Sequence, residues 1–258
     1  MQKKSLLISR NIRKKILRIT HIAQSAHIAS SFSIVDIITV LYLNIINRNS
    51  QNTFILSKGH ACLAHYCLLN ELGIISNKIL NSYGKNNSIL MSHSSHKVKG
   101  VEFSSGSLGH GLPVATGIAM SNLMKKKKER VFVLLSDGEL NEGSNWESIL
   151  FAAHQKLKNL VVVIDYNKIQ SLDFVKKTIR LDPLKEKFLS FGCNVVSIDG
   201  HNHKQILNAF KKKTSKPLII VANTIKGKGI SFMENKVLWH YRPPNEIELY
   251  KGLKELEK

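Results

Sequence analysis

Four short runs of valine, isoleucine and leucine constrain the fold of this chain more than any other feature. Each run contains no charged residue and ends at polar or glycine residues, which is typical of strands buried on both faces of a parallel sheet. The runs are residues 131–135, 160–164, 194–198 and 218–222. Helical patterns lie between them, notably at 146–157 and 203–213. This alternation predicts an α/β fold with a doubly wound, mostly parallel sheet and helices on both faces.

The first part of the chain predicts helices rather than strands. Apolar residues recur at helical spacing through residues 5–46, for example at Ile12, Ile16 and Ile19. We expect two helices here, separated near residues 25–33. With 258 residues, of which 43% are hydrophobic, the chain can build one large α/β domain over residues 1–258.

Two polar residues follow neighbouring apolar runs at a spacing that predicts a metal site. Asp137 follows the run 131–135, and Asn167 follows the run 160–164, thirty residues further along the chain. That spacing fits one strand end, a crossover helix and a second strand end, so both side chains are expected at the same sheet edge. One carboxylate, one amide oxygen and a backbone carbonyl suit Mg²⁺, and a diphosphate can complete its coordination. The alternative is a simple turn followed by a strand-end cap.

Two further segments are candidates for binding an anion. Residues 104–113 contain three glycines before a helical pattern that begins at Val114, and such a loop presents backbone N–H groups at a helix start. Residues 224–229, with the sequence TIKGKG, follow the last apolar run and combine flexible glycines with cationic side chains. A glycine-rich turn without a ligand and a solvated loop are the alternatives.

The motif around Asp137 resembles the thiamine diphosphate motif, in which G-D-G is followed at this spacing by an asparagine. Within that group the chain is similar to transketolase over most of its length, through the motifs S-K-G-H, S-L-G-H-G, S-D-G-E and T-I-K-G-K-G. The resemblance implies the diphosphate-binding module of the thiamine diphosphate-binding fold. It also implies an enzyme that uses thiamine diphosphate and Mg²⁺ to transfer a two-carbon ketol unit from a ketose phosphate to an aldose phosphate.

The resemblance assigns the metal site to three positions. It implies that Asp137, Asn167 and the carbonyl of Ile169 bind the metal, while Gly138 lets the backbone approach the diphosphate closely. Ser136 stands where the family has the first glycine of its motif, which puts the details of that approach in question.

The resemblance also assigns three positions around the cofactor. Gly106 is expected near the diphosphate and Leu108 near the thiazolium ring, with His110 standing where glutamine is common. Glu142 is similar to an acid at the interface between subunits that communicates with the glutamate activating the cofactor. By itself Glu142 is also compatible with a carboxylate in the first turn of a helix, where the helix dipole favours it.

Four histidines that lie far apart in the sequence complete the predicted site. They are His27, His60, His93 and His240. Histidine can hydrogen-bond sugar hydroxyls and move protons during ketol cleavage, and the resemblance implies this role for all four. It further implies that His60 and His240 contact the cofactor. Taken singly, each histidine is compatible with a structural role.

The resemblance implies that a partner chain supplies the other half of the enzyme. We expect a C-terminal, pyrimidine-binding transketolase subunit that provides the activating glutamate, with two copies of each chain in the hetero-oligomer. Two alternatives are half of a deoxyxylulose-phosphate synthase and half of an oxo-acid dehydrogenase. Departures at Ala26, Ser136 and Tyr241 leave a degenerate scaffold as a third.

A formal charge of +20 raises nucleic acid binding as an alternative function. The densest run, residues 125–128, falls between a helical pattern and an apolar run, where a solvated turn is expected. The remaining lysines are dispersed and lack the interleaved aromatic residues that stack on bases. Nucleic acid is therefore not an expected partner.

Cysteine usage and hydropathy indicate the compartment. Cys62, Cys67 and Cys193 form no C-x-x-C pair and leave an odd count, which predicts neither a disulfide framework nor a cysteine zinc site. No segment approaches the roughly 18 to 20 uncharged apolar residues that cross a bilayer. We therefore expect a soluble protein of the reducing cytoplasm with no membrane partner.

Overall fold

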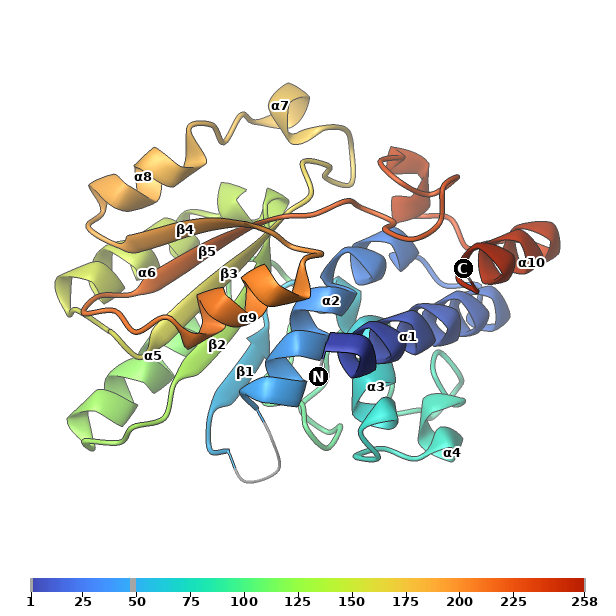
Figure 1. The fold of residues 1–258 in the computed structure, drawn as a ribbon, viewed down its shortest axis with the longest axis horizontal. Helices are drawn as coiled ribbons and strands as arrows, with labels where there is room; N and C mark the ends of the chain where they lie inside the picture. The colour runs from blue at the N-terminus through green and yellow to red at the C-terminus, as the bar shows by residue number, and fades with distance from the viewer. Residues whose placement is uncertain (1, 47–49, 258) are drawn as a thin grey trace.

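A five-stranded, all-parallel sheet organises the part of the chain that the computed structural model describes, residues 2–46 and 50–257 (Figure 1). Across the sheet the strand order is β1-β2-β3-β5-β4, and every neighbouring pair is parallel. The strands are β1 (Thr53–Leu56), β2 (Val131–Ser136), β3 (Leu160–Tyr166), β4 (Asn194–Asp199) and β5 (Leu218–Asn223).

Helices cover both faces of this sheet, which confirms the predicted doubly wound α/β class (Figure 1). Because side chains alternate along a strand, β2 directs Phe132 and Leu134 into one core and Val133 and Leu135 into the other. The first core contains α1, α2, α3 and α9, and the second contains α5, α6 and α8. The helices are α1 (Gln2–Ala23), α2 (Ile28–Asn44), α3 (Cys62–Glu71), α4 (Asn77–Leu80), α5 (Gly111–Met124), α6 (Gly143–His154), α7 (Val175–Thr178), α8 (Leu184–Ser190), α9 (His203–Lys211) and α10 (Glu246–Glu255), with 3-10 turns η1 (Gly59–Ala61), η2 (Gly138–Asn141) and η3 (Val237–His240).

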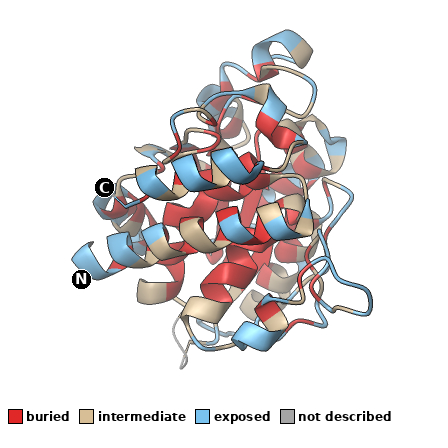
Figure 2. Cartoon of the chain, turned by 90° about the vertical axis from the view of Figure 1, so that its right-hand side faces the viewer, coloured by how far each residue is buried: buried red, intermediate tan, exposed pale blue. Residues whose placement is uncertain are grey.

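The first two helices differ in depth. Every residue from 28 to 42 in α2 is buried, whereas α1 buries one stripe that includes Ile12, Ile16 and Leu17. Figure 2 views the end of the molecule that carries both termini and shows outer helices with one buried and one exposed side. Among the described residues, none of the helices combines the length and hydropathy required to span a bilayer.

The break between α1 and α2 is shorter than the sequence predicts. It covers residues 24–27, whereas residues 25–33 were expected, because Ser30, Ser31 and Ser33 lie inside α2. The hydroxyl of Ser33 donates to the carbonyl of Ser30 at 3.0 Å. Serine hydroxyls that bond within the helix in this way can be buried without ending it. The helix expected from Val114 likewise begins earlier, at Gly111.

Two strands also differ from the sequence prediction. Strand β1 was not predicted, because its four residues are too few to show a strand pattern. The segment at β4 was predicted to be a buried strand, but β4 is an edge strand whose residues are all intermediate or exposed. An edge strand has a neighbour on only one side, so valine and isoleucine residues at this position remain partly accessible.

Candidate active site

A cavity of about 220 Å³ lies at the carboxyl ends of the strands and contains nearly all of the predicted site residues. In parallel α/β sheets this edge is where ligands bind. The predicted residues that line the cavity are His27, His60, His93, Gly106, Leu108, Asp137, Gly138, Asn167, Ile169 and His240. Glu142 does not line it. The cavity lining also includes Lys58 and Lys226, which the site prediction did not contain.

The four predicted histidines form one cluster although they lie far apart in sequence. The ring centroid of His27 is 5.2 Å from that of His60, 5.9 Å from that of His93 and 5.0 Å from that of His240. Burial lowers the pKa of His27 to about 4 and that of His240 to about 3, and neighbouring histidines and lysines add to the effect. Burial likewise holds the pKa of His60 well below its usual value. These three imidazoles are therefore neutral at pH 7.

His27 occupies an unusual backbone position at the start of α2. Its φ of 70° lies in the left-handed region, which a non-glycine residue rarely adopts. Its N–H donates to the carbonyl of His240 at 2.8 Å, so the surrounding structure holds this conformation. Backbone strain of this kind is common where a side chain must be aimed into a site.

The predicted metal ligands lie together at the ends of β2 and β3. The carboxylate of Asp137 accepts from the N–H groups of Gly138 at 2.7 Å and Lys168 at 2.5 Å. The amide oxygen of Asn167 accepts from the N–H of Ile169 at 3.1 Å. Burial, followed by the nearby charge of Asp165, raises the pKa of Asp137 to about 7. Among the described residues Asp137 has no ion-pair partner, so a bound cation would favour its ionised form.

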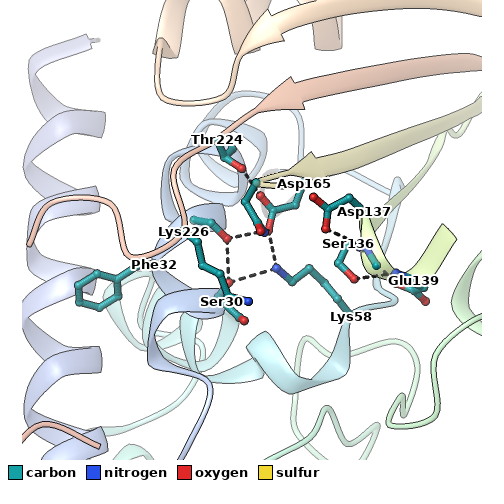
Figure 3. Close-up of polar contacts among 12 residues, drawn as sticks. Ser30, Phe32, Lys58, Ser136, Asp137, Glu139, Asp165, Thr224 and Lys226 are labelled. Atoms are coloured by element: carbon teal, nitrogen blue, oxygen red, sulfur yellow. Dashed lines mark hydrogen bonds and ion pairs between the residues drawn. The ribbon is translucent and has the colours of Figure 1, made fainter. Parts of the chain in front are cut away.

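A fully buried ion pair supports the wall of the cavity (Figure 3). The ammonium group of Lys58 donates to Asp165 at 2.5 Å and to the carbonyl of Ser30 at 3.2 Å, and both charged side chains are 0% exposed. Asp165 also accepts from the hydroxyls of Ser33 and Thr224. Burial by itself raises the pKa of Asp165, but Lys58 and these hydrogen bonds outweigh it and lower the pKa.

Lys226 brings a second buried ammonium group into the cavity. It donates to the carbonyl of Ile169 at 2.9 Å and lies 2.9 Å from Nδ1 of His240. Burial, followed by repulsion from Lys58, lowers the pKa of Lys226 to about 7. No carboxylate of the described residues is within ion-pair distance of it. An anionic group in the cavity would therefore stabilise its charged form.

The residues present fit a diphosphate and Mg²⁺. A carboxylate, an amide oxygen and a carbonyl are hard oxygen ligands, and two buried ammonium groups offer charge-assisted hydrogen bonds to phosphate oxygens. Elsewhere in the described part of the chain, no three His, Cys, Asp or Glu side chains are grouped to hold a metal. Because the Ile169 carbonyl already accepts from Lys226, a metal there would use its second lone pair or displace Lys226.

Glu139 joins the loops around the cavity and was not predicted from the sequence. Its carboxylate accepts from the hydroxyl of Ser57 at 2.5 Å, from the N–H of Gly109 at 3.0 Å and from the N–H of Ser136 at 3.3 Å. Burial raises its pKa. Glu142 lies at the start of α6 beside Gly109, where an added Cβ would be 2.7 Å from that of Glu142.

Close backbone packing at Gly59 leads to a stability prediction. A Cβ added at Gly59 would lie 2.2 Å from the carbonyl oxygen of Ser105, so the loops after β1 and before α5 would have to separate. We expect Gly59→Ala to destabilise the free chain by about 1–3 kcal/mol in chemical denaturation. The matched control is Gly117→Ala in α5, where an added Cβ meets nothing within 4 Å. That change should stabilise the helix by about 0.5–1 kcal/mol, and equal effects at both positions would contradict the packing argument.

The lysines are less dispersed than the sequence indicates. The predicted turn at residues 125–128 is present, and at the amino edge of the sheet it forms a groove with cations from other segments. The groove is lined by Lys126, Lys127, Lys128, Arg130, Lys158, Lys212 and Lys213, together with Leu123, Asn159 and Thr214. This lining contains no aromatic residue for stacking on bases, and the groove lies at the sheet edge opposite the cavity.

Known proteins share both the sequence and the fold of this chain. Residues 6–254 match the family model for the transketolase thiamine diphosphate binding domain. One of the two subunits of the apulose-4-phosphate transketolase of Actinobacillus succinogenes is 38% identical over 257 residues, with 95% of this chain and 93% of that protein covered. A 6-deoxy-6-sulfo-D-fructose transketolase subunit of a Clostridium species is 34% identical over 243 residues, with 90% and 88% covered.

A solved structure agrees with these sequence matches. Transketolase from Campylobacter jejuni superposes with a TM-score of 0.89 at 25% identity, over 98% of this chain and 42% of that chain. The family model covers nearly the whole of the present sequence, and the motifs that match the family converge on one cavity. The chain therefore belongs to the transketolase family and constitutes a thiamine diphosphate-binding domain of that family.

Proposed function

We propose that this chain is the diphosphate-binding subunit of a two-chain transketolase, which uses thiamine diphosphate and Mg²⁺ to transfer a two-carbon ketol unit between sugars. One observation carries the proposal: a single cavity gathers oxygen ligands, two buried ammonium groups and a cluster of neutral histidines. These groups suit a metal ion, a diphosphate and sugar hydroxyls respectively.

Each group has a proposed role in the reaction. Asp137, Asn167 and the Ile169 carbonyl hold Mg²⁺, and the two lysines neutralise the diphosphate. When bound, thiamine diphosphate supplies the electron sink for cleavage of the carbon–carbon bond beside the ketose carbonyl. A neutral imidazole of His27 or His60 accepts the proton of the donor's C3 hydroxyl as that bond breaks. The same group then returns the proton to the oxygen of the acceptor aldehyde as the new bond forms.

A partner chain is part of this proposal. The Campylobacter transketolase chain is more than twice as long as the part covered here, because the match spans 42% of it. Both relatives described above are named as subunits. We place the pyrimidine-binding half on a separate C-terminal subunit, residues 1–258 in one domain, and two copies of each chain in the assembly. Glu142, outside the cavity at the start of α6, is assigned to that interface.

The names of the relatives narrow the substrate class. They identify apulose 4-phosphate for one enzyme and 6-deoxy-6-sulfo-D-fructose for the other. We therefore expect the donor to be a ketose that carries a phosphate or sulfonate group, which need not be an intermediate of the pentose phosphate pathway.

Reconstitution tests the proposed function. The chain is isolated with its bound partner, supplied with thiamine diphosphate and Mg²⁺, and assayed for ketol transfer from ketose phosphates, apulose 4-phosphate and 6-deoxy-6-sulfo-D-fructose. Transfer that needs both chains is the expected result. Activity with pyruvate or another oxo acid as the only donor would indicate a different thiamine diphosphate enzyme. A stable complex that binds no cofactor, or co-purifying nucleic acid without activity, would contradict the proposal.

Substitutions in the histidine cluster give a second expected result. Replacing His60 or His240 with alanine should lower kcat/KM by about 10²- to 10⁴-fold, the range for removing a proton-transfer group. His154→Ala, at the end of α6 outside the cavity lining, is the matched control and should leave the rate unchanged. Thermal unfolding checks that all variants are folded. Near-normal activity in His60→Ala would remove the histidine cluster from the proposed chemistry.

A further inference from the structure

A buried polar cluster outside the cavity connects the first two helices to the loop that carries Lys226. At its centre is Asp36 of α2, which is 5% exposed. Its carboxylate accepts from Arg13 at 2.6 and 3.1 Å, from Nδ1 of His201 at 2.8 Å and from Nε2 of His203 at 3.1 Å. Burial raises the pKa of Asp36, but Arg13 and the two histidines outweigh it and hold the pKa well below its usual value. Asp36 is therefore an ionised acceptor.

His201 uses its second ring nitrogen to hold the backbone of a different element. Its Nε2 accepts from the N–H of Ile225 at 2.9 Å. A ring nitrogen that accepts a hydrogen bond carries no proton, so the neutral imidazole is protonated at Nδ1, the atom that faces Asp36. Asp36 thus selects the one tautomer of His201 that can accept from Ile225.

The bond to Ile225 acts on the segment that places Lys226. The loop is also held at Thr224 and at Gly227, by hydrogen bonds to β3 and α2. Between these two points, the N–H of Ile225 is anchored by His201 and the ammonium group of Lys226 enters the cavity. His201 does not line the cavity itself, so any effect on the site passes through the loop.

We propose that His201 is a positioning residue, which together with Asp36 holds the Ile225 amide and so places Lys226 for the diphosphate. The link to the diphosphate rests on the proposed function, whereas the link to the loop does not. A positioning role requires the acceptor at Nε2. A purely structural role within the polar cluster requires the donor at Nδ1 instead.

Two conservative variants separate these roles. The amide of His201→Asn reaches about as far as Nδ1, so it can still donate to Asp36 but cannot accept from Ile225. The longer amide of His201→Gln reaches about as far as Nε2, so it can still accept from Ile225 but loses the donor to Asp36. Hydrogen exchange of residues 224–229 in the free chain measures the loop, and titration with thiamine diphosphate and Mg²⁺ measures the site.

We expect His201→Asn to speed exchange of the Ile225 amide and to weaken thiamine diphosphate binding, each by about tenfold, the scale of one hydrogen bond. The kcat at saturating cofactor and the melting temperature should stay close to wild type. His201→Gln should show the reverse, with near-normal exchange and cofactor binding but a lower melting temperature. His203→Ala, which removes a cluster member that does not contact Ile225, is the control and should leave exchange at 224–229 near normal.

Other outcomes overturn the inference. If His201→Asn leaves both loop exchange and cofactor binding at wild-type values, His201 does not position the loop. The same conclusion follows if both variants loosen the loop equally, because the identity of the lost nitrogen would then not matter. If the wild-type protein binds no thiamine diphosphate, the proposed function fails, and the exchange comparison alone decides whether His201 holds the loop.

Discussion

Replacing Asp137 with alanine should abolish ketol transfer by the assembled enzyme, with kcat/KM falling by about 10³-fold or more, which corresponds to roughly 4 kcal/mol. Asp137 is the only carboxylate among the three predicted metal ligands, and it is 1% exposed. Its removal takes away the negative charge that holds Mg²⁺, and with the metal goes the main attachment of the diphosphate. The measurement is the rate of the two-chain enzyme at several concentrations of cofactor and metal.

The same variant has a distinct stability signature in the free chain. Because the pKa of Asp137 is raised from 3.8 to about 7, its stabilising contribution is fully present below pH 3.8 and is lost as pH rises through 7. Without metal, the wild type should therefore lose stability between pH 5 and pH 8 more steeply than Asp137→Ala does, and added Mg²⁺ and thiamine diphosphate should narrow the difference. Full activity in the variant, or identical pH slopes, would contradict the assignment.

The two buried lysines should respond very differently to replacement by methionine. Lys58→Met removes one partner of an ion pair in which both side chains are 0% exposed, so it leaves Asp165 as an uncompensated buried charge. We expect the free energy of unfolding of the free chain to fall by about 3–5 kcal/mol. Chemical denaturation at pH 7.5 is the measurement.

Lys226→Met is the matched control, because Lys226 is also buried but has no carboxylate partner among the described residues. Its pKa is lowered from 10.5 to about 7, so its stabilising contribution is present above pH 10.5 and is lost as pH falls through 7. The variant should be destabilised far less than Lys58→Met and should compare best with wild type at the lowest pH. Both variants should bind thiamine diphosphate more weakly.

A double variant tests the reason for the difference. Combining Lys58→Met with Asp165→Asn removes the uncompensated charge and should recover part of the lost stability, since the two effects are coupled through one contact. Equal losses for Lys58→Met and Lys226→Met, or additive losses in the double variant, would show that the ion pair does not stabilise the fold.

Some of this site could be read from the sequence because its cause is local. Asp137 and Asn167 each follow an apolar run, and adjacent parallel strands necessarily end at the same edge. Strand β1 could not be read in this way because its four residues are too few for periodicity. The edge position of β4 was also hidden, since the same valine-rich composition occurs in central and edge strands.

The roles of individual charged residues were harder to read. Lys58 stands in the same S-K-G-H motif as His60, yet nothing local to the motif shows that its ammonium group is buried. Its position directly after a strand was the one available signal. Glu139 also lay within a quoted motif, but its bonds run to Ser57 and Gly109, which are far away in the chain.

The sequence by itself determined the alternation of strands and helices, the oxygen ligands at the strand ends and the membership of the transketolase family, because periodicity and motif spacing are properties of short segments. Only the tertiary structure decided that four distant histidines form one cluster and that Asp165, 107 residues from Lys58, is its partner. It also decided that His201 reaches Ile225. The physical reason is that burial, and with it the pKa of each group, depends on which distant segments exclude water from that group.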